Sequence, residues 1–209
     1  MMSIDAVLPE SIADQLRASI LAQTDAPGST LTEAAVALRF GVARPTARIA
    51  IERLVADGLL RREAHRAARV PQLRRDDIVD LFNNRAIVEG AAIAALESIP
   101  AEALAAHRSL VASTDFAQSD IQFHRALVAG QPSPRLARMH ALLMGEIELC
   151  IGQVQAAQLL TATEIAAQHQ GILDAITAGD RDAAAQLARD HIAHSRDALL
   201  NHVDRTTDG

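Results

Sequence analysis

The sequence predicts a mainly α-helical protein, with a helix-turn-helix unit at the N-terminus and an antiparallel bundle of six helices after it. Three observations lead to this fold class. Apolar residues recur at helical spacing through most of the chain. Alanine and arginine, both good helix formers, are used heavily. Proline and glycine interrupt the pattern at short intervals. With 209 residues, of which 49% are hydrophobic, the chain is long enough for one or two globular domains.

Several protein classes are excluded by composition. A single cysteine, Cys150, excludes a disulfide scaffold and a cysteine-rich zinc fold. No apolar run approaches the roughly 18 residues of a transmembrane helix. The N-terminal segment is acidic and amphipathic and lacks the layout of a signal peptide. We therefore expect a cytoplasmic protein with no membrane partner.

The charge divides the chain into two parts. All 20 basic residues are arginine, and residues 1–75 hold 11 of them against 8 acidic residues. Residues 76–209 hold 9 arginines against 18 acidic residues. Such asymmetry favours a nucleic-acid-binding module joined to a different domain. Pro71 disfavours helix before it, and Asp76 and Asp77 suit a helix start. We place the domains at 1–74 and 75–209.

The first domain reads as short helices followed by a hairpin. The apolar spacing and the breakers predict helices over about 9–23, 32–40 and 44–58. The segments 59–62 and 66–70 are candidates for the two short strands of a hairpin.

Residues 32–58 have the layout of a helix, a tight turn and a second helix. Thr32 can cap the first helix, Leu38 supplies an apolar contact, and Gly41 permits the turn. Three polar residues then stand at the start of the second helix, the end that enters the major groove in a helix-turn-helix: Arg44, Thr46 and Arg48. Arginine donates two hydrogen bonds to guanine or holds phosphates. On spacing alone, a plain helical hairpin with solvated arginines fits as well.

Residues 9–70 resemble the winged-helix domain of the GntR family of bacterial transcription regulators. The resemblance lies in Pro27-Gly28, Leu31-Thr32-Glu33, Gly41-Val42-Ala43-Arg44, Arg48, Leu54 and Gly58-Leu59-Leu60. It implies that Arg44, Thr46 and Arg48 read DNA. The family's Ser is Ala43 here, and its Thr and Pro are exchanged as Pro45-Thr46. Two further features depart from the family. The residue after the second arginine is Ile49 where Glu is usual, and the wing, 62–70, lacks its glycine. The wing keeps arginines that suit phosphates, and among them we assign Arg66 to DNA.

The second domain reads as helical throughout. Its predicted helices span about 77–97, 101–114, 118–129, 134–157, 161–178 and 181–204. The breaks between them contain Pro100, Pro132, Pro134 and Gly179-Asp180. Short links between successive helices favour an antiparallel bundle.

Four residues of this domain are candidate metal ligands. Asp120 and His124 are four residues apart and so share one helix face. His169 and His191 each lie on an apolar stripe that faces the core. Three imidazoles and one carboxylate suit a divalent transition metal and leave positions open for a ligand carboxylate. The alternative is that these are ordinary hydrogen-bonded core residues.

Residues 76–205 resemble the all-helical FCD domain of the FadR-type branch of the GntR family. The matching segments are 120–127, 133–136, 169–176, 179–180 and 188–192. Six helices resemble the shorter, VanR-like subgroup. The resemblance implies that Asp120, His124, His169 and His191 bind the metal. It also makes Arg85 the candidate for binding the carboxylate of an effector. Ligand type favours Zn²⁺, with Ni²⁺, Mn²⁺ or Fe²⁺ as alternatives.

The hypothesis that unites these features is a homodimeric transcriptional repressor. It would bind a palindromic double-stranded operator and sense a small organic acid at the metal. No catalytic residue is assigned. Two alternatives remain at this stage. One is a DNA-binding dimer with a purely structural metal. The other is a metal-dependent hydrolase, for which the sequence offers no matched general base.

Overall fold

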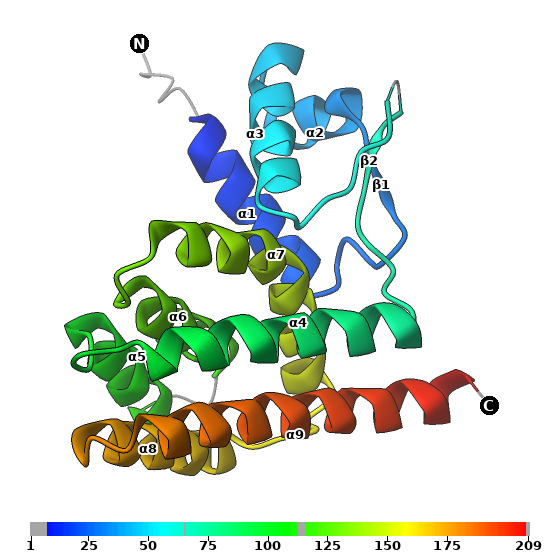
Figure 1. Cartoon of the computed structure of the whole chain (residues 1–209). Helices are drawn as coiled ribbons and strands as arrows, with labels where there is room; N and C mark the ends of the chain where they lie inside the picture. The colour runs from blue at the N-terminus through cyan, green and yellow to red at the C-terminus, as the bar shows by residue number, and fades with distance from the viewer. Residues whose placement is uncertain (1–7, 65, 113–115, 208–209) are drawn as a thin grey trace. The chain divides into compact units, whose positions relative to one another are not determined.

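The computed structural model describes residues 8–64, 66–112 and 116–207 and separates into two compact units (Figure 1). The first unit ends at Leu73 and the second begins at Arg74. Among the described residues, no helix has the length and apolar character that crossing a membrane requires. Both units are mainly helical, as the sequence predicts.

The first unit is a helix-turn-helix with a small sheet. Its elements are α1 (Pro9–Leu21), β1 (Thr30–Leu31), α2 (Glu33–Phe40), α3 (Arg44–Ala56) and β2 (Ala68–Arg69). The Thr32 hydroxyl accepts a hydrogen bond from the Ala35 amide at 3.1 Å and so caps α2. Gly41 ends α2 with φ of 64°, a left-handed conformation that favours glycine. The tight turn into α3 follows.

The expected hairpin of 59–62 and 66–70 is corrected. Strand β2 pairs antiparallel with β1, and segment 59–62 contributes only an isolated bridge between Arg61 and Arg69. The reason is local. The amides of Leu59 and Leu60 both donate to the Leu54 carbonyl, closing the end of α3, and both side chains are buried. Their backbone donors are therefore not available for a strand ladder.

The second unit contains six helices in the part of the chain that is described. They are α4 (Arg75–Ala94), α5 (Ala101–Ala112), α6 (Ala117–Ala129), α7 (Pro134–Ala156), α8 (Ala162–Thr177) and α9 (Arg181–Thr207). Ser133 and Thr161 cap α7 and α8 through their hydroxyls. Helix α9 extends beyond the expected end at 204.

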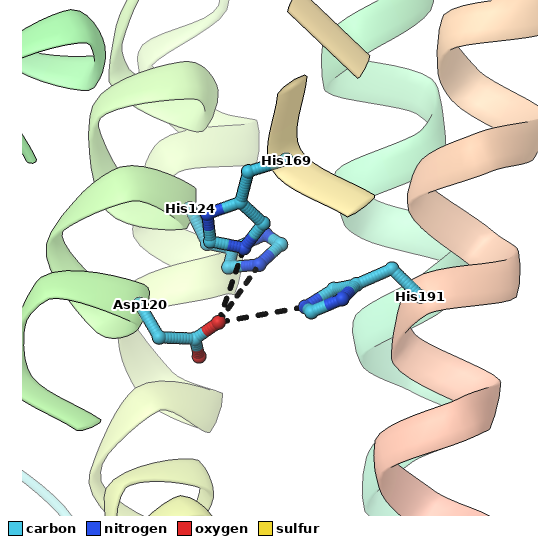
Figure 2. Close-up of side chains that lie close together, drawn as sticks. All are labelled: Asp120, His124, His169 and His191. Atoms are coloured by element: carbon cyan, nitrogen blue, oxygen red, sulfur yellow. Dashed lines mark ion pairs between the residues drawn. The ribbon is translucent and has the colours of Figure 1, made fainter. Parts of the chain in front are cut away.

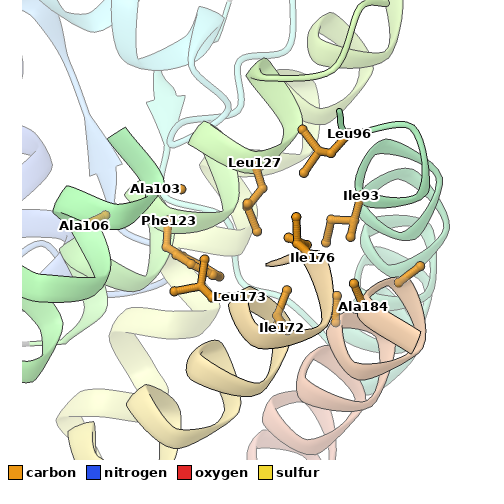
Figure 3. Packing of buried hydrophobic residues seen from close by; sticks show 12 residues of the cluster. Ile93, Leu96, Ala103, Ala106, Phe123, Leu127, Ile172, Leu173, Ile176 and Ala184 are labelled. Atoms are coloured by element: carbon orange, nitrogen blue, oxygen red, sulfur yellow. The ribbon is translucent and has the colours of Figure 1, made fainter. Parts of the chain in front are cut away.

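A compact apolar core holds five of these helices together (Figure 3). Phe123 and Leu127 of α6 meet Ile172 and Leu173 of α8, with Ile93 of α4 beside them. The small residues of the core are alanines on α5 and α9: Ala103, Ala106, Ala184, Ala185 and Ala188. Alanine at these places lets the helices approach closely, and so brings the polar faces of α6, α8 and α9 together.

Helix α4 lies alongside α9 (Figure 1). A side chain at Gly90 of α4 would collide with the Arg189 guanidinium of α9. A larger residue at this position would therefore have to displace the flexible end of the Arg189 side chain. The helix that carries Arg85 and Glu89 thus packs against the helix that carries His191.

Candidate metal and effector site

Three helices bring the four predicted ligands to one place inside the second unit. Asp120 and His124 lie one turn apart on α6, His169 lies on α8 and His191 on α9, and their side chains point toward one another (Figure 2). One ligand atom from each lies within 4.8 Å of all the others. All four residues are buried.

The Nε2 atoms of the three histidines face one carboxylate oxygen. Oδ1 of Asp120 lies 3.2 Å from Nε2 of His169, 3.5 Å from that of His191 and 3.6 Å from that of His124 (Figure 2). In the part of the chain that is described, none of these four atoms has a hydrogen-bond partner. Buried polar atoms without partners are costly, and a cation bound among them would satisfy all four. The donor set therefore fits a transition metal.

The electrostatics of Asp120, His169 and His191 favour the forms that bind a metal, whereas Glu89 outweighs the effect of burial and raises the pKa of His124. Burial lowers the pKa of His169 to about 3 and also lowers the pKa of His191. Burial raises the pKa of Asp120, but the three nearby imidazoles outweigh it and leave that pKa well below its ordinary value. Two of the imidazoles are thus neutral and the carboxylate is ionised, as metal ligands must be.

Two ligands are held by groups outside the set of four. Phe123 stacks on His169 with ring centroids 3.9 Å apart and planes 12° apart. The Oε1 atom of Gln168 lies 2.6 Å from Nδ1 of His191. A polar partner on the second nitrogen of a ligating histidine fixes the ring and its tautomer. Gln168 is therefore placed to orient His191.

A buried glutamate connects the cluster to α4 and α7. Glu89 lies 2.7 Å from Nε of Arg85, 2.5 Å from Nδ1 of His124 and 2.9 Å from Nε2 of His140. Burial raises the pKa of Glu89, but Arg85 and His124 hold it well below its ordinary value. The sequence assigns no role to Glu89, and for His140 it leaves open whether the residue lines the pocket or belongs to a core stripe. The spacing of Arg85 and Glu89, one helical turn apart, was the available signal.

The Arg85 guanidinium is buried and only partly paired. Its Nε donates to Glu89, whereas Nη1 and Nη2 have no hydrogen-bond partner among the described residues. Burial lowers the pKa of Arg85, but the charges of Glu89 and Asp120 outweigh it and raise that pKa above its ordinary value. The group therefore stays charged. Two free donors on one planar cation match the two oxygens of a carboxylate.

The first unit presents its arginines at the surface. Arg44 and Arg48 are exposed at the start of α3, and Thr46 is half-buried beside them. Nε of Arg48 lies 2.7 Å from Oε1 of Glu52. Arg66 is exposed and lies 3.1 Å from Glu63.

A surface hollow of this unit joins Arg48 to the wing. It is lined by Leu31, Thr32, Glu33, Arg48, Arg62, Arg66 and Ala67. Arg62 lies 4.0 Å from both Glu33 and Glu52, so two carboxylates stand between the arginines of α3 and of the wing. Arg62 was not singled out in the sequence, although it lies in the arginine-bearing wing segment.

Comparisons with known proteins agree with both units. Residues 8–70 match the family described as bacterial regulatory proteins, gntR family, and residues 80–194, more than half of the chain, match the FCD domain. The chain is 28% identical over 197 residues to the "Probable D-xylose utilization operon transcriptional repressor" of Paenarthrobacter nicotinovorans, covering 88% of this chain and 86% of that protein.

Solved structures show the same architecture. A GntR transcriptional regulator from Rhodococcus sp. RHA1 is 27% identical with a TM-score of 0.75, covering 92% of this chain and 97% of that one. E. coli McbR/YncC shares the fold, with a TM-score of 0.73 at 19% identity over 97% of this chain and 100% of that one. This chain therefore belongs to the GntR family of transcriptional regulators, in the FadR-type branch with an FCD domain, and is a DNA-binding regulator rather than an enzyme.

Proposed function

We propose that the chain is a homodimeric repressor whose affinity for a palindromic operator changes when a small organic acid binds at a metal site. In this proposal residues 1–74 read DNA, and residues 75–209 sense the acid and dimerise. The observation that carries the proposal is the pairing of two features in one buried place. An Asp-His₃ cluster lies beside an arginine with two unpaired donors.

Asp120, His124, His169 and His191 would hold the metal. Zn²⁺ suits this mixture of nitrogen and oxygen donors, and Ni²⁺, Mn²⁺ and Fe²⁺ suit it as well. A bound divalent ion supplies a Lewis acid whose remaining positions accept a carboxylate oxygen. The Arg85 guanidinium would bind the same acid through Nη1 and Nη2. The response to the acid requires that it bind the two conformational states of the dimer with different affinity.

Repression is the direction of control that the similar proteins support. The relative from Paenarthrobacter nicotinovorans is named as the repressor of an operon for D-xylose utilization. We extend repression to this chain, with release when the acid binds. The sugar in that protein's name is not part of the proposal.

The first experiment is metal analysis of the purified protein. We expect about one transition-metal ion per chain in the wild type and none in the His169→Ala/His191→Ala double variant. His194→Ala is the matched control, because His194 is an exposed histidine on the same helix as His191. A metal-free wild type, even after reconstitution with Zn²⁺, Ni²⁺, Mn²⁺ and Fe²⁺, would contradict the metal site.

A second measurement tests the effector. A set of small carboxylic acids is screened by thermal shift on the metal-loaded wild type and on Arg85→Met. We expect at least one acid to raise the Tm of the wild type, to leave that of Arg85→Met unchanged and to weaken operator binding by the wild type. A metal that binds while no acid changes operator affinity would reduce the site to a structural one.

A third measurement tests the DNA-binding residues. Replacing Arg44 or Arg48 by Ala should abolish selective binding to the operator and leave the helical content unchanged, because both side chains are exposed. Arg66→Ala should weaken binding to all sequences alike and lower the salt dependence by about one counterion, as loss of a phosphate contact does. Operator binding by Arg44→Ala equal to that of the wild type would show that α3 is not the reading helix.

A further inference from the structure

Helix α3 exposes an isoleucine. It buries Ala47, Ala50, Ile51 and Leu54 on the face that packs against its unit. Ile49 lies on the opposite face and is 52% exposed. Packing of the described residues therefore does not bury this side chain, and contact with a ligand or partner would remove its apolar surface from water.

The surroundings of Ile49 are apolar on one side and charged on the other, where Glu52 pairs with Arg48. Pro45 precedes it by one helical turn and is also exposed, so the two form a small apolar surface. Arg48 is its neighbour in sequence, with a side chain that is 61% exposed. Arg44 is exposed one turn before Arg48. A small apolar surface bordered by arginines matches the major groove, where phosphates border base edges and thymine presents a methyl group.

We infer that Ile49 is a specificity-determining residue that contacts the 5-methyl group of a thymine in each operator half-site. This inference rests on the proposed role of α3 as the reading helix. Among the four bases, only thymine presents an apolar group in the major groove. Because Arg48 is adjacent, the thymine lies beside the base or phosphate that Arg48 contacts. Isoleucine has no hydrogen-bonding group, whereas a glutamate at this place would accept a hydrogen bond from the amino group of cytosine. The isoleucine therefore shifts the base preference from cytosine to thymine.

The test removes the methyl group from the DNA rather than from the protein. The operator is first obtained by selecting wild-type binding sites from a randomised duplex library. Each thymine is then replaced in turn by deoxyuridine, which lacks only the 5-methyl group. At one thymine of each half-site, we expect the wild type to lose about fourfold in affinity, the value of one buried methyl-sized group. Ile49→Ala should lose no affinity on the same replacement.

Two variants control the interpretation. Ile49→Val keeps a branched apolar side chain and should keep most of the preference for thymine over deoxyuridine. Leu38→Ala also removes an exposed apolar side chain, since Leu38 is 85% exposed, but from α2. It should bind both DNAs as the wild type does. Circular dichroism melting confirms that each variant folds.

The outcomes separate this inference from the proposed function. Loss of operator binding in Arg44→Ala and Arg48→Ala, together with an equal thymine preference in wild type and Ile49→Ala, would overturn the role of Ile49 alone. Wild-type binding by both arginine variants would overturn α3 as the reading helix and the inference with it. Selection of the same sites by Ile49→Glu as by wild type would also overturn the role of Ile49.

Discussion

The two units contain the same ion pair in two settings. On α3, Nε of Arg48 lies 2.7 Å from Oε1 of Glu52, and on α4, Nε of Arg85 lies 2.7 Å from Oε1 of Glu89. Both pairs join residues four apart on a helix. The side chains of the first pair are 61% and 49% exposed, and those of the second are 0% and 1% exposed. Sequence spacing and atomic distance do not distinguish them.

The difference in burial gives the two ion pairs different energetics. The exposed pair is screened by water and salt, so exchange of Glu52 for a phosphate or a base, as proposed for Arg48, would cost little. The two charges of the buried pair have lost their hydration, and only their mutual attraction compensates for that loss. Removing either partner therefore leaves an uncompensated buried charge. The first pair therefore suits reversible DNA binding. The second suits a fixed site that keeps a guanidinium in place for an anion.

The largest expected effect comes from breaking the buried pair. Glu89→Ala leaves Arg85 buried and unpaired, and we expect the unfolding free energy to fall by about 3–5 kcal/mol. Denaturant titration followed by far-ultraviolet ellipticity, with chelator present to remove metal, measures it. Glu52→Ala is the matched control and should leave the transition unchanged. Replacing both Arg85 and Glu89 by Leu should restore most of the loss. Equal denaturant midpoints for Glu89→Ala and the wild type would show that the buried pair contributes no more to stability than the exposed one.

The pH dependence of the metal-free protein tests burial at the histidines. Burial lowers the pKa of His169 to about 3 and lowers that of His191, whereas an unfolded chain binds these protons near pH 6.5. The unfolded state therefore gains protons first, and stability should fall as the pH drops from about 6.5 toward 3. His124, whose pKa is raised, contributes in the opposite direction.

We expect a slope of about 1 kcal/mol per pH unit from His169 between pH 6 and 5, and a contribution of the same sign from His191. Denaturant titrations across this range give the slope directly. His169→Ala should flatten it, and His194→Ala, at an exposed position, should not. A slope that is the same in all three proteins would mean that these imidazoles titrate as they do in water.

A smaller effect is expected at Gln168, which lies beside the cluster without joining it. Because its Oε1 atom lies 2.6 Å from Nδ1 of His191, Gln168→Ala should lower metal affinity by about tenfold while keeping the stoichiometry. Competition with a chromophoric chelator measures the affinity. Gln170→Ala, two residues further along and exposed, is the control. No difference between the two variants would remove Gln168 from the site.

The smallest effect is expected from freeing the exposed pair. Glu52→Gln releases Arg48 and removes a negative charge beside it, so affinity for duplex DNA should rise by no more than about fivefold. Glu10→Gln makes the same change of charge at an exposed position of α1 in the same unit and should raise affinity less. A change of a hundredfold in Glu52→Gln would show that this carboxylate locks Arg48 rather than exchanging with DNA.

Helix positions were the most predictable part of the molecule. Capping by Thr32, the left-handed Gly41 and apolar periodicity are local signals, and the helices they predict are present. The resemblance to the FCD domain implies the set Asp120, His124, His169 and His191, and the structure brings these four residues together. The sequence pattern itself places only His169 and His191 on core-facing stripes. Conversely, Leu38 was expected to pack and is exposed, because α2 buries Val36 and Ala37 instead.

The features that the sequence did not predict depend on contacts between segments distant in the chain. Strand β1 has two residues and no alternation to detect, and the partner of Thr30 in the register is Arg69, 39 positions away. The contact of His140 with Glu89 joins α7 to α4 and has no local signature. Both pairings join segments that are distant in sequence and meet only in the folded chain. The local sequence pattern therefore does not predict them.

The stacked rings of Phe123 and His169 also make the site readable by spectroscopy. The chain has no tryptophan or tyrosine, and only four phenylalanines and eight histidines. Its absorption and fluorescence in the near ultraviolet are therefore weak. The fluorescence of one engineered tryptophan would report on a single position. In a proton magnetic resonance spectrum, the ring current of Phe123 displaces the His169 signals from those of the exposed histidines. Occupancy of this imidazole can thus be followed in the unlabelled protein.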